Sequence, residues 1–383
     1  DALYDVIEHW ANAVDLDRFY ITYGTLEDAV RDYSKSKADN VIQIINNNIP
    51  QRKNFMMLLQ QSDNPFPWIK RLKEEKYFDP SKNPAPEESK DGTGGIIEER
   101  WLELDVLKSA AKLWKSEKPV RNIQLVKSIL DRIIQHEIKS AGIRNRDTHW
   151  SITEIICLLP ENRISERHID FIRIAIKSSK GLTPIDTLVC DNLLEKLIIG
   201  RNKKLLLKLL NILFEYEYKD SSDEENKPKT HIDPHILESA LNKHKSSISK
   251  LCAEEAAQIA INRIESIIEV NRYQFESYVI PTIENSEQTY FTEDLNCQLT
   301  YFVRDMLEKM QIDRARVFLV EFLGNKHSIF HRIALHVINQ KYECFNDLFW
   351  KWRNNPLNEY SSKHEIFELI KSNCIEFTVE QVN

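Results

Sequence analysis

Glycine is scarce in this chain: only eight of its 383 residues are glycine, where average usage near 7% would give about 27. Glycine serves tight turns, strand kinks and the close approach of the backbone to phosphate, because it tolerates positive φ angles without a steric penalty. Three of the eight, Gly92, Gly94 and Gly95, lie together in one polar segment. Few positions elsewhere suit hairpins or phosphate-binding loops, and this favours an all-α fold.

Several patterns that mark other protein classes are also missing. No apolar run approaches the ~18 residues that span a bilayer, so we expect no association with a membrane. The six cysteines form no C-x-x-C pair, which predicts free thiols and a cytoplasmic location. P-loop and G-x-G-x-x-G motifs are absent, and the glycine cluster lacks the lysine that would bind phosphate. We therefore expect the chain to bind no cofactor.

The charge balance is acidic overall. The chain has 52 Lys and Arg residues against 59 Asp and Glu residues, a formal net charge of −7. Sequence-independent binding to nucleic acid needs a net or strongly local excess of basic residues, so it is not the first expectation here. With 42% hydrophobic and 29% charged residues, the composition is that of a folded protein rather than a disordered one.

Helical periodicity recurs along most of the chain. In one segment the apolar residues step by three and four positions, as one buried helix face requires: Ile123, Val126, Leu130, Ile133, Ile134 and Ile138. Helices are expected to begin near prolines, because the first residue of a helix needs no N–H: Pro119, Pro184, Pro234 and Pro356. Gly200 and Gly324 follow apolar runs, where a left-handed residue often ends a helix. The pattern predicts about twenty short helices.

Two polar interruptions divide the chain. The first carries prolines and the glycine cluster, and the second, KDSSDEENKPKT, is charged and free of apolar residues. We predict an N-terminal helical region over 1–79, a Pro/Gly-rich loop over 80–98, helical repeats over 99–218, a charged mobile loop over 219–230, and helical repeats over 231–383.

One segment resembles a known repeat family. The stretch HSIFHRIALHVINQ, His327–Gln340, has Arg332, Ala334 and Leu335 in the R-x-A-L order of the second helix of HEAT repeats. From Glu99 onward, helices come in pairs of roughly 40 residues, the unit size of HEAT and armadillo arrays. Together these features predict a helical-repeat solenoid of HEAT-like helix pairs with an N-terminal helical cap. Two irregular helical bundles are the alternative architecture.

Two further stretches resemble parts of large bacterial proteins. WIKRLKEEKYFDPSKNPAP (68–86) and FHRIALHVINQKYECFNDLFWKWRNNPL (330–357) are similar to stretches of proteins in which helical repeats follow an effector domain, several of them in anti-phage defence systems. The resemblance implies the sensor or scaffold arm of a larger protein and transfers no functional residue. Since the first residue is Asp1 and not Met, we also expect the chain to be part of a longer polypeptide.

Clusters of basic residues are candidates for contact with nucleic acid. A stripe of cations on a concave repeat surface would follow a phosphate backbone. The candidate contacts are Arg201, Lys203, Lys204, Lys208, Lys243 and Lys245. Lys70, Arg71 and Lys73 form another basic group. Because acidic residues are interleaved nearby, ordinary surface charge is the competing interpretation.

Metal-dependent chemistry has little support in the sequence. His327 and His331 are four residues apart, which would place two ligands on one helix face, but no third ligand is identifiable. The same spacing separates His231 and His235. Glu217-Tyr218-Lys219 has the E-x-K order of metal-dependent nucleases, without an upstream Asp on a strand. We predict no metal site, no catalytic residue and no enzymatic activity, and rank a metal-dependent nuclease third among the hypotheses.

The C-terminal segment CFNDLFWKW concentrates aromatic residues. Phe345 and Phe349 should face the core, which leaves Trp350 and Trp352 as candidate anchors of a protein interface. Packing of both indoles against a neighbouring helix is the alternative. With no catalytic motif, the sequence favours a non-enzymatic scaffold or recognition module that binds a protein partner, and nucleic-acid binding is the second hypothesis.

Overall fold

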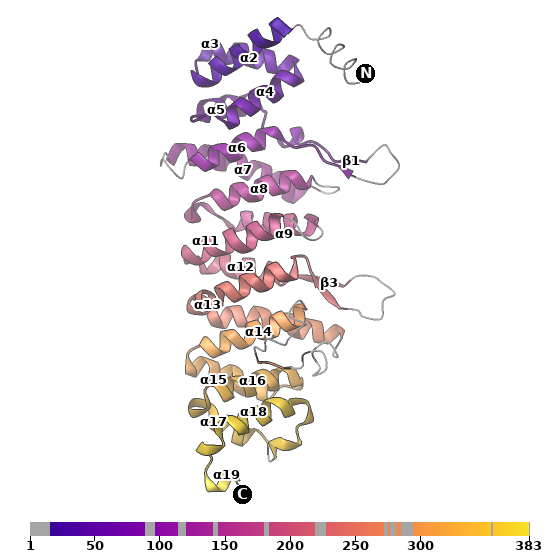
Figure 1. Ribbon diagram of the computed structural model, residues 1–383, viewed down its shortest axis with the longest axis vertical. Coiled ribbons are helices and arrows are strands. Elements are labelled where there is room, and N and C mark those ends of the chain that lie inside the picture. The colour runs from indigo at the N-terminus through magenta and orange to yellow at the C-terminus, as the bar shows by residue number, and fades with distance from the viewer. Residues whose placement is uncertain are drawn as a thin grey trace, which may run out of the picture. The chain divides into compact units, whose positions relative to one another are not determined.

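Helices make up most of the structure, which confirms the predicted all-α class (Figure 1). The computed structural model describes residues 16–88, 96–113, 120–140, 145–179, 184–218, 227–271, 275, 280, 282–284, 294–353 and 355–382. Within these ranges, strands occur only in two short antiparallel pairs, and no helix is both long and apolar enough to cross a membrane. Contacts divide the chain into two compact units, Asp1–Ser178 and Ser179–Asn383.

The N-terminal unit consists mainly of helices of moderate length. They are α2 (Leu16–Arg31), α3 (Lys35–Asn47), α4 (Ile49–Gln60), α5 (Phe66–Glu74), α6 (Leu102–Leu113), α7 (Val120–Lys139), α8 (Arg146–Leu158) and α9 (Glu166–Ser179), with short 3-10 turns η1 (Pro80–Lys82) and η2 (Glu161–Arg163). Polar side chains cap the helix starts. Ser34 accepts a hydrogen bond from the backbone N–H of Lys37, and Asn48 accepts one from that of Gln51.

Several helices of the N-terminal unit contact the helix two places along the chain. α2 packs on α4, α4 on α6 and α6 on α8, while α5 packs on α7. Neighbours in sequence also touch, such as α3 with α4 and α6 with α7. α4 and α6 therefore each pack against a sequence neighbour and against helices two places away.

Trp68 anchors α5 to the helices before it. Its side chain is fully buried, and its indole N–H donates a hydrogen bond to the Ala29 carbonyl at 3.1 Å. The rings of Tyr33 and Phe55 meet the indole edge to face, with centroids 5.1 and 4.9 Å away. One side chain thus joins α5 to α2, to α4 and to the segment that follows α2.

Two buried histidines cross-link α7 to the helices that follow it. His168 of α9 accepts a hydrogen bond from the Ser165 backbone N–H at Nδ1, so its proton lies on Nε2, which donates to Asp131 at 2.8 Å. This imidazole is therefore neutral. Asp131 also pairs with Lys127 one turn earlier on α7.

His149 of α8 is the second buried histidine. Its Nδ1 lies 2.8 Å from the Ser178 hydroxyl, which also lies 2.9 Å from the Ala175 carbonyl. Nε2 lies 3.1 Å from a carboxylate oxygen of Glu137. The Glu137 carboxylate accepts this bond, so Nε2 of His149 carries a proton, and both side chains are buried.

These pairs predict a loss of stability in acid. Burial acts to raise the pKa of Glu137, but the hydrogen bond and charge of His149 outweigh it and hold the pKa below its ordinary value of 4.5. Burial also acts to raise the pKa of Asp131, but the hydrogen bonds from His168 and Lys127 outweigh this effect and hold the pKa below its ordinary value of 3.8. A carboxyl whose pKa is lower in the folded state stabilises the fold above its unfolded pKa and loses that contribution as the pH falls through the folded value.

We therefore expect the urea midpoint of the chain to fall steeply below about pH 4.5. The Glu137→Gln variant is expected to start less stable at pH 7 and to show a shallower decline. Equal slopes for the variant and the parent protein, measured by circular dichroism from pH 7 to pH 3, would contradict the assignment.

The C-terminal unit is also mostly helical. Its elements are α10 (Pro184–Thr187), the π-helix η3 (Leu188–Leu193), α11 (Leu194–Ile199), α12 (Lys203–Leu213), α13 (Pro234–Val270), α14 (Leu295–Lys309), α15 (Ile312–Leu323), α16 (Ser328–Gln340), α17 (Tyr342–Trp352), η5 (Pro356–Asn358), η6 (Tyr360–Ser362), α18 (Lys363–Asn373), η7 (Cys374–Glu376) and α19 (Val379–Val382). α13 is kinked at Cys252, where φ is −162° and ψ is 45°. α14 packs on α16, α16 on α18 and α15 on α17.

The prolines and glycines predicted to mark helix ends lie at helix ends where the structure describes them, but the left-handed conformation expected of the two glycines is wrong. Pro184, Pro234 and Pro356 each begin a helical element, whereas Pro119 lies outside the described residues. Gly200 and Gly324 end α11 and α15, but both are right-handed, with φ of −71° and −87°. After α11 the left-handed position is the next residue, Arg201, with φ of 51°.

The two segments predicted as loops contain short strands. Within 80–98, β1 (Glu87–Glu88) pairs with β2 (Ile96–Ile97). At the second interruption, β3 (Tyr216–Tyr218) pairs with β4 (Pro228–Thr230) in register Tyr216 to Thr230. The glycine cluster and residues 219–226 lie outside the described residues.

Candidate functional site

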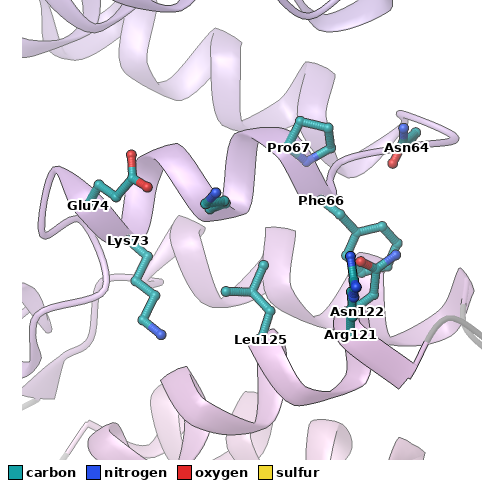
Figure 2. A pocket seen from close by; sticks show the side chains of 9 residues that line it. Asn64, Phe66, Pro67, Lys73, Glu74, Arg121, Asn122 and Leu125 are labelled. Carbon is teal, nitrogen blue, oxygen red and sulfur yellow. The ribbon is translucent and has the colours of Figure 1, made fainter. Parts of the chain in front are cut away.

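A cleft between α5 and α7 is the candidate site of the N-terminal unit. It has a volume of about 800 Å³ and is lined by Asn64, Phe66, Pro67, Lys70, Lys73, Glu74, Arg121, Asn122 and Leu125. Phe66 and Lys73 from α5 face the same space as Arg121 and Leu125 from α7 (Figure 2). We call this the α5–α7 cleft.

The amphipathic pattern of α5 places its basic residues in the cleft. Trp68, Ile69 and Leu72 are buried in the core, so Lys70 and Lys73, three positions apart, lie together on the other side of the helix. The first turns of α7 supply Arg121 and Asn122. Buried apolar residues further along fix α7 in place: Val126, Ile129, Leu130, Ile133 and Ile134.

The cleft carries an excess of positive charge. Its lining includes three cations and one carboxylate, that of Glu74. Lys73 donates a hydrogen bond to the Ser128 hydroxyl at 2.8 Å, which leaves its charge uncompensated. Among the described residues, the side chains of Lys70 and Arg121 have no ion-pair or hydrogen-bond partner. Three unneutralised cations around an apolar floor of Phe66, Pro67 and Leu125 suit a ligand that is both acidic and apolar.

Arg71 belongs to the same basic sequence group but has a structural role. Its guanidinium pairs with Asp39 at 3.0 Å and with Glu75 at 2.7 Å. The structure therefore separates Arg71 from its neighbours Lys70 and Lys73, which line the cleft.

The basic residues predicted to contact nucleic acid lie among carboxylates. Lys203 pairs with Glu255, Lys243 with Glu195 at 2.9 Å, and Lys245 with Asp305 at 2.8 Å. Lys204 and Lys208 also interact with other residues. Arg201 is exposed at the end of α11. A phosphate backbone would have to compete with these acidic partners.

Both candidate interface tryptophans are half-buried and hydrogen-bonded within the chain. The Trp350 indole N–H donates to the Tyr342 hydroxyl at 2.9 Å, and the ring packs against Phe377. The Trp352 indole N–H donates to the Leu323 carbonyl at 2.8 Å, and its ring lies against His331. In this arrangement the indoles hold the C-terminal elements together.

The histidine pairs and the E-x-K segment do not gather into a metal site. His331 donates from Nε2 to the Asn325 carbonyl, and burial lowers its pKa. His231 precedes α13 and His235 lies in its first turn, so they do not share a helix face. Glu217 is exposed on β3, and Lys219 lies outside the described residues. In the described ranges, no group of three His, Cys, Asp or Glu side chains could hold a metal ion.

The sequence alone indicates Lys70 and Lys73 as part of a basic group but does not predict the cleft. Arg121 and Leu125 lie about fifty positions later in the chain, and tertiary packing brings them to the same cleft. Arg121 lies in the first turn of α7, and nothing in its local sequence marks it as part of a site.

Comparisons with known proteins add no relative. The chain matches no protein-family model, and searches against curated proteins and solved structures find no match.

Proposed function

We propose that this chain is a non-enzymatic helical scaffold that binds a protein partner, and that an acidic segment of the partner lies in the α5–α7 cleft. The observation that carries the proposal is the set of Lys70, Lys73 and Arg121 around the apolar floor of one cleft. The volume of about 800 Å³ falls within the ~300–1,000 Å³ of typical ligand pockets.

The packing of the helices supports a repeat architecture. In each unit, helices two places apart are in contact, as α4–α6–α8 and α14–α16–α18 are. Stacked helix pairs of this kind leave long surfaces free for a partner. We propose a HEAT-like repeat array that works as the scaffold arm of a larger bacterial defence protein. The cysteines are all free thiols, which is consistent with a cytoplasmic location.

A protein segment fits the cleft better than nucleic acid does. Phe66, Pro67 and Leu125 offer an apolar floor, which the aliphatic side chains of an acidic peptide can fill. A nucleic acid would also need cations beyond the cleft. The candidates Lys203, Lys243 and Lys245 are already paired with carboxylates. Nucleic-acid binding remains the second hypothesis.

Fluorescence anisotropy with designed peptides tests the proposal. The probe is a labelled decapeptide with four glutamates and three leucines, and a matched peptide carries lysines in place of the glutamates. We expect saturable binding of the acidic peptide only, weakened about tenfold to a hundredfold by the double substitution Lys70→Glu and Arg121→Glu and reduced by salt.

Lys53→Glu is the matched control, because Lys53 is an exposed lysine on α4 outside the cleft. Its effect should stay below twofold. Equal loss of binding in the control and the cleft variant would contradict the proposal. Binding of single-stranded DNA or RNA at low salt, lost on charge reversal at Lys203 and Lys204, would instead favour the second hypothesis.

A further inference from the structure

One face of α15 is exposed and carries apolar and acidic side chains together. Val317 and Val320 are 62% and 55% exposed. Asp313 and Glu321 are also exposed and lie beside the valines at helical spacing. We call these four residues the α15 face. The opposite side of the helix is buried in the core through Ala315, Phe318, Leu319, Phe322 and Leu323.

Both arginines of α15 are neutralised by carboxylates of neighbouring helices. Arg314 pairs with Glu254 of α13 at 3.8 Å, and Arg316 pairs with Asp347 of α17 at 2.9 Å. By contrast, the two carboxylates of the α15 face have no ion-pair or hydrogen-bond partner among the described residues. The α15 face therefore keeps a net negative charge.

α13 extends this negative charge. Glu265 and Glu269 are exposed one turn apart on α13, and the Arg314–Glu254 ion pair links this helix to α15. Partial burial and the charges of Glu321 and Glu269 raise the pKa of Glu265 above its ordinary value of 4.5. Like charges this close repel one another. A positively charged partner would relieve the repulsion, so the surface is suited to bind one.

The α5–α7 cleft has the complementary chemistry. Its three uncompensated cations surround an apolar floor of Phe66, Pro67 and Leu125, whereas the α15 face presents carboxylates beside two valines. The ligand proposed for the cleft is an acidic segment with aliphatic side chains, and this chain itself carries such a segment on an exposed helix. Helices commonly bind by laying one face into a groove between other helices. Every copy of the chain supplies both surfaces, and this favours a second copy as the partner.

We propose that the α15 face of one copy of this chain docks into the α5–α7 cleft of a second copy. Val317 and Val320 cover the apolar floor, and Glu321 lies toward the cations of Lys70 and Arg121. The proposal rests on the proposed function, because it names the acidic partner of the cleft. The two surfaces differ, so copies can join as a reciprocal pair or head to tail. One helix face in one cleft is a small interface, which predicts weak and reversible association.

A charge swap followed by sedimentation velocity of the full chain tests the proposal. One variant reverses the cleft, Lys70→Glu with Arg121→Glu, and the other reverses the acidic surface, Glu265→Lys with Glu321→Lys. For the unmodified chain in low salt, we expect the weight-average mass to rise about 1.5-fold above the monomer mass between about 5 and 200 μM. Each variant alone should stay within about 10% of the monomer mass, because like charges then meet at the contact. An equimolar mixture of the two variants should associate again, because opposite charges meet.

Glu27→Lys with Glu161→Lys is the matched control. It changes the net charge by the same amount at two exposed glutamates, on α2 and η2, outside both surfaces. This control should associate like the unmodified chain. Val317→Ser with Val320→Ser changes no charge and should weaken association at least about threefold, because the apolar part of the contact is lost.

The outcomes separate this contact from the proposed function. A constant monomer mass of the unmodified chain, or a mixture of the two charge-reversed variants that stays monomeric, would overturn the contact between copies. Acidic-peptide binding in the cleft would still stand in either case, because the anisotropy experiment measures it independently. Association of either charge-reversed variant alone, as strong as that of the unmodified chain, would also contradict the proposed contact.

Discussion

Replacing His149 by alanine is expected to lower the free energy of unfolding of the N-terminal unit by about 3–5 kcal/mol. The substitution removes a buried imidazole and leaves the Glu137 carboxylate, itself 5% exposed, without its shortest hydrogen bond. The hydrogen bond of Asn83 to Glu137, at 3.3 Å, is too weak a replacement. Urea denaturation followed by far-ultraviolet circular dichroism measures the change.

The neighbouring His136 is a matched control. It lies 3.8 Å from the same carboxylate, but its side chain is 52% exposed, so solvent screens the interaction and His136→Ala should cost at most about 0.5 kcal/mol. Replacing both His149 and Glu137 by leucine removes the unpaired charge and should recover much of the loss. A loss below 1 kcal/mol in His149→Ala would show that the carboxylate is not held as an ion pair.

Replacing Trp68 by alanine is expected to destabilise the same unit by about 3–5 kcal/mol. The change removes the indole that fills the space between α2, α4 and α5, together with its bond to the Ala29 carbonyl. Trp68→Phe keeps most of the ring volume and loses the bond, so it should cost about 1–2 kcal/mol. Hydrogen exchange of the α5 backbone amides would report the loosening locally.

This second substitution also tests the link between the core and the cleft. Trp68 fixes the orientation of α5, and α5 carries Lys70 and Lys73 on its other side. In Trp68→Ala the acidic peptide should therefore bind more weakly, even at low temperature, where the unit stays folded. Trp150→Ala is the control, because Trp150 is half-buried on α8 and does not line the cleft. Unchanged peptide affinity in Trp68→Ala would show that α5 is held by other contacts.

Much of the secondary structure follows from local features of the sequence. Ile123 to Ile138 repeat at helical spacing and lie within α7, and prolines begin α10 and α13. These predictions succeed because periodic burial and capping act over a few neighbouring residues. Local features predict the structure less well where several backbone conformations can end the same helix. At the end of α11, glycine was expected to be left-handed, yet Arg201 takes that conformation.

The scarcity of glycine and the repeated apolar spacing thus determined the helical class by themselves, because helix formation depends on neighbours within four positions. The sequence also identified Lys70 and Lys73 as basic. Only the tertiary structure brought Arg121 beside them, gave His149 its buried carboxylate, and paired Lys203 with Glu255. Whether a charged side chain is free or neutralised depends on residues of helices that lie far apart in the chain. The packing of apolar helix faces, and not the local sequence pattern, decides which of these helices meet.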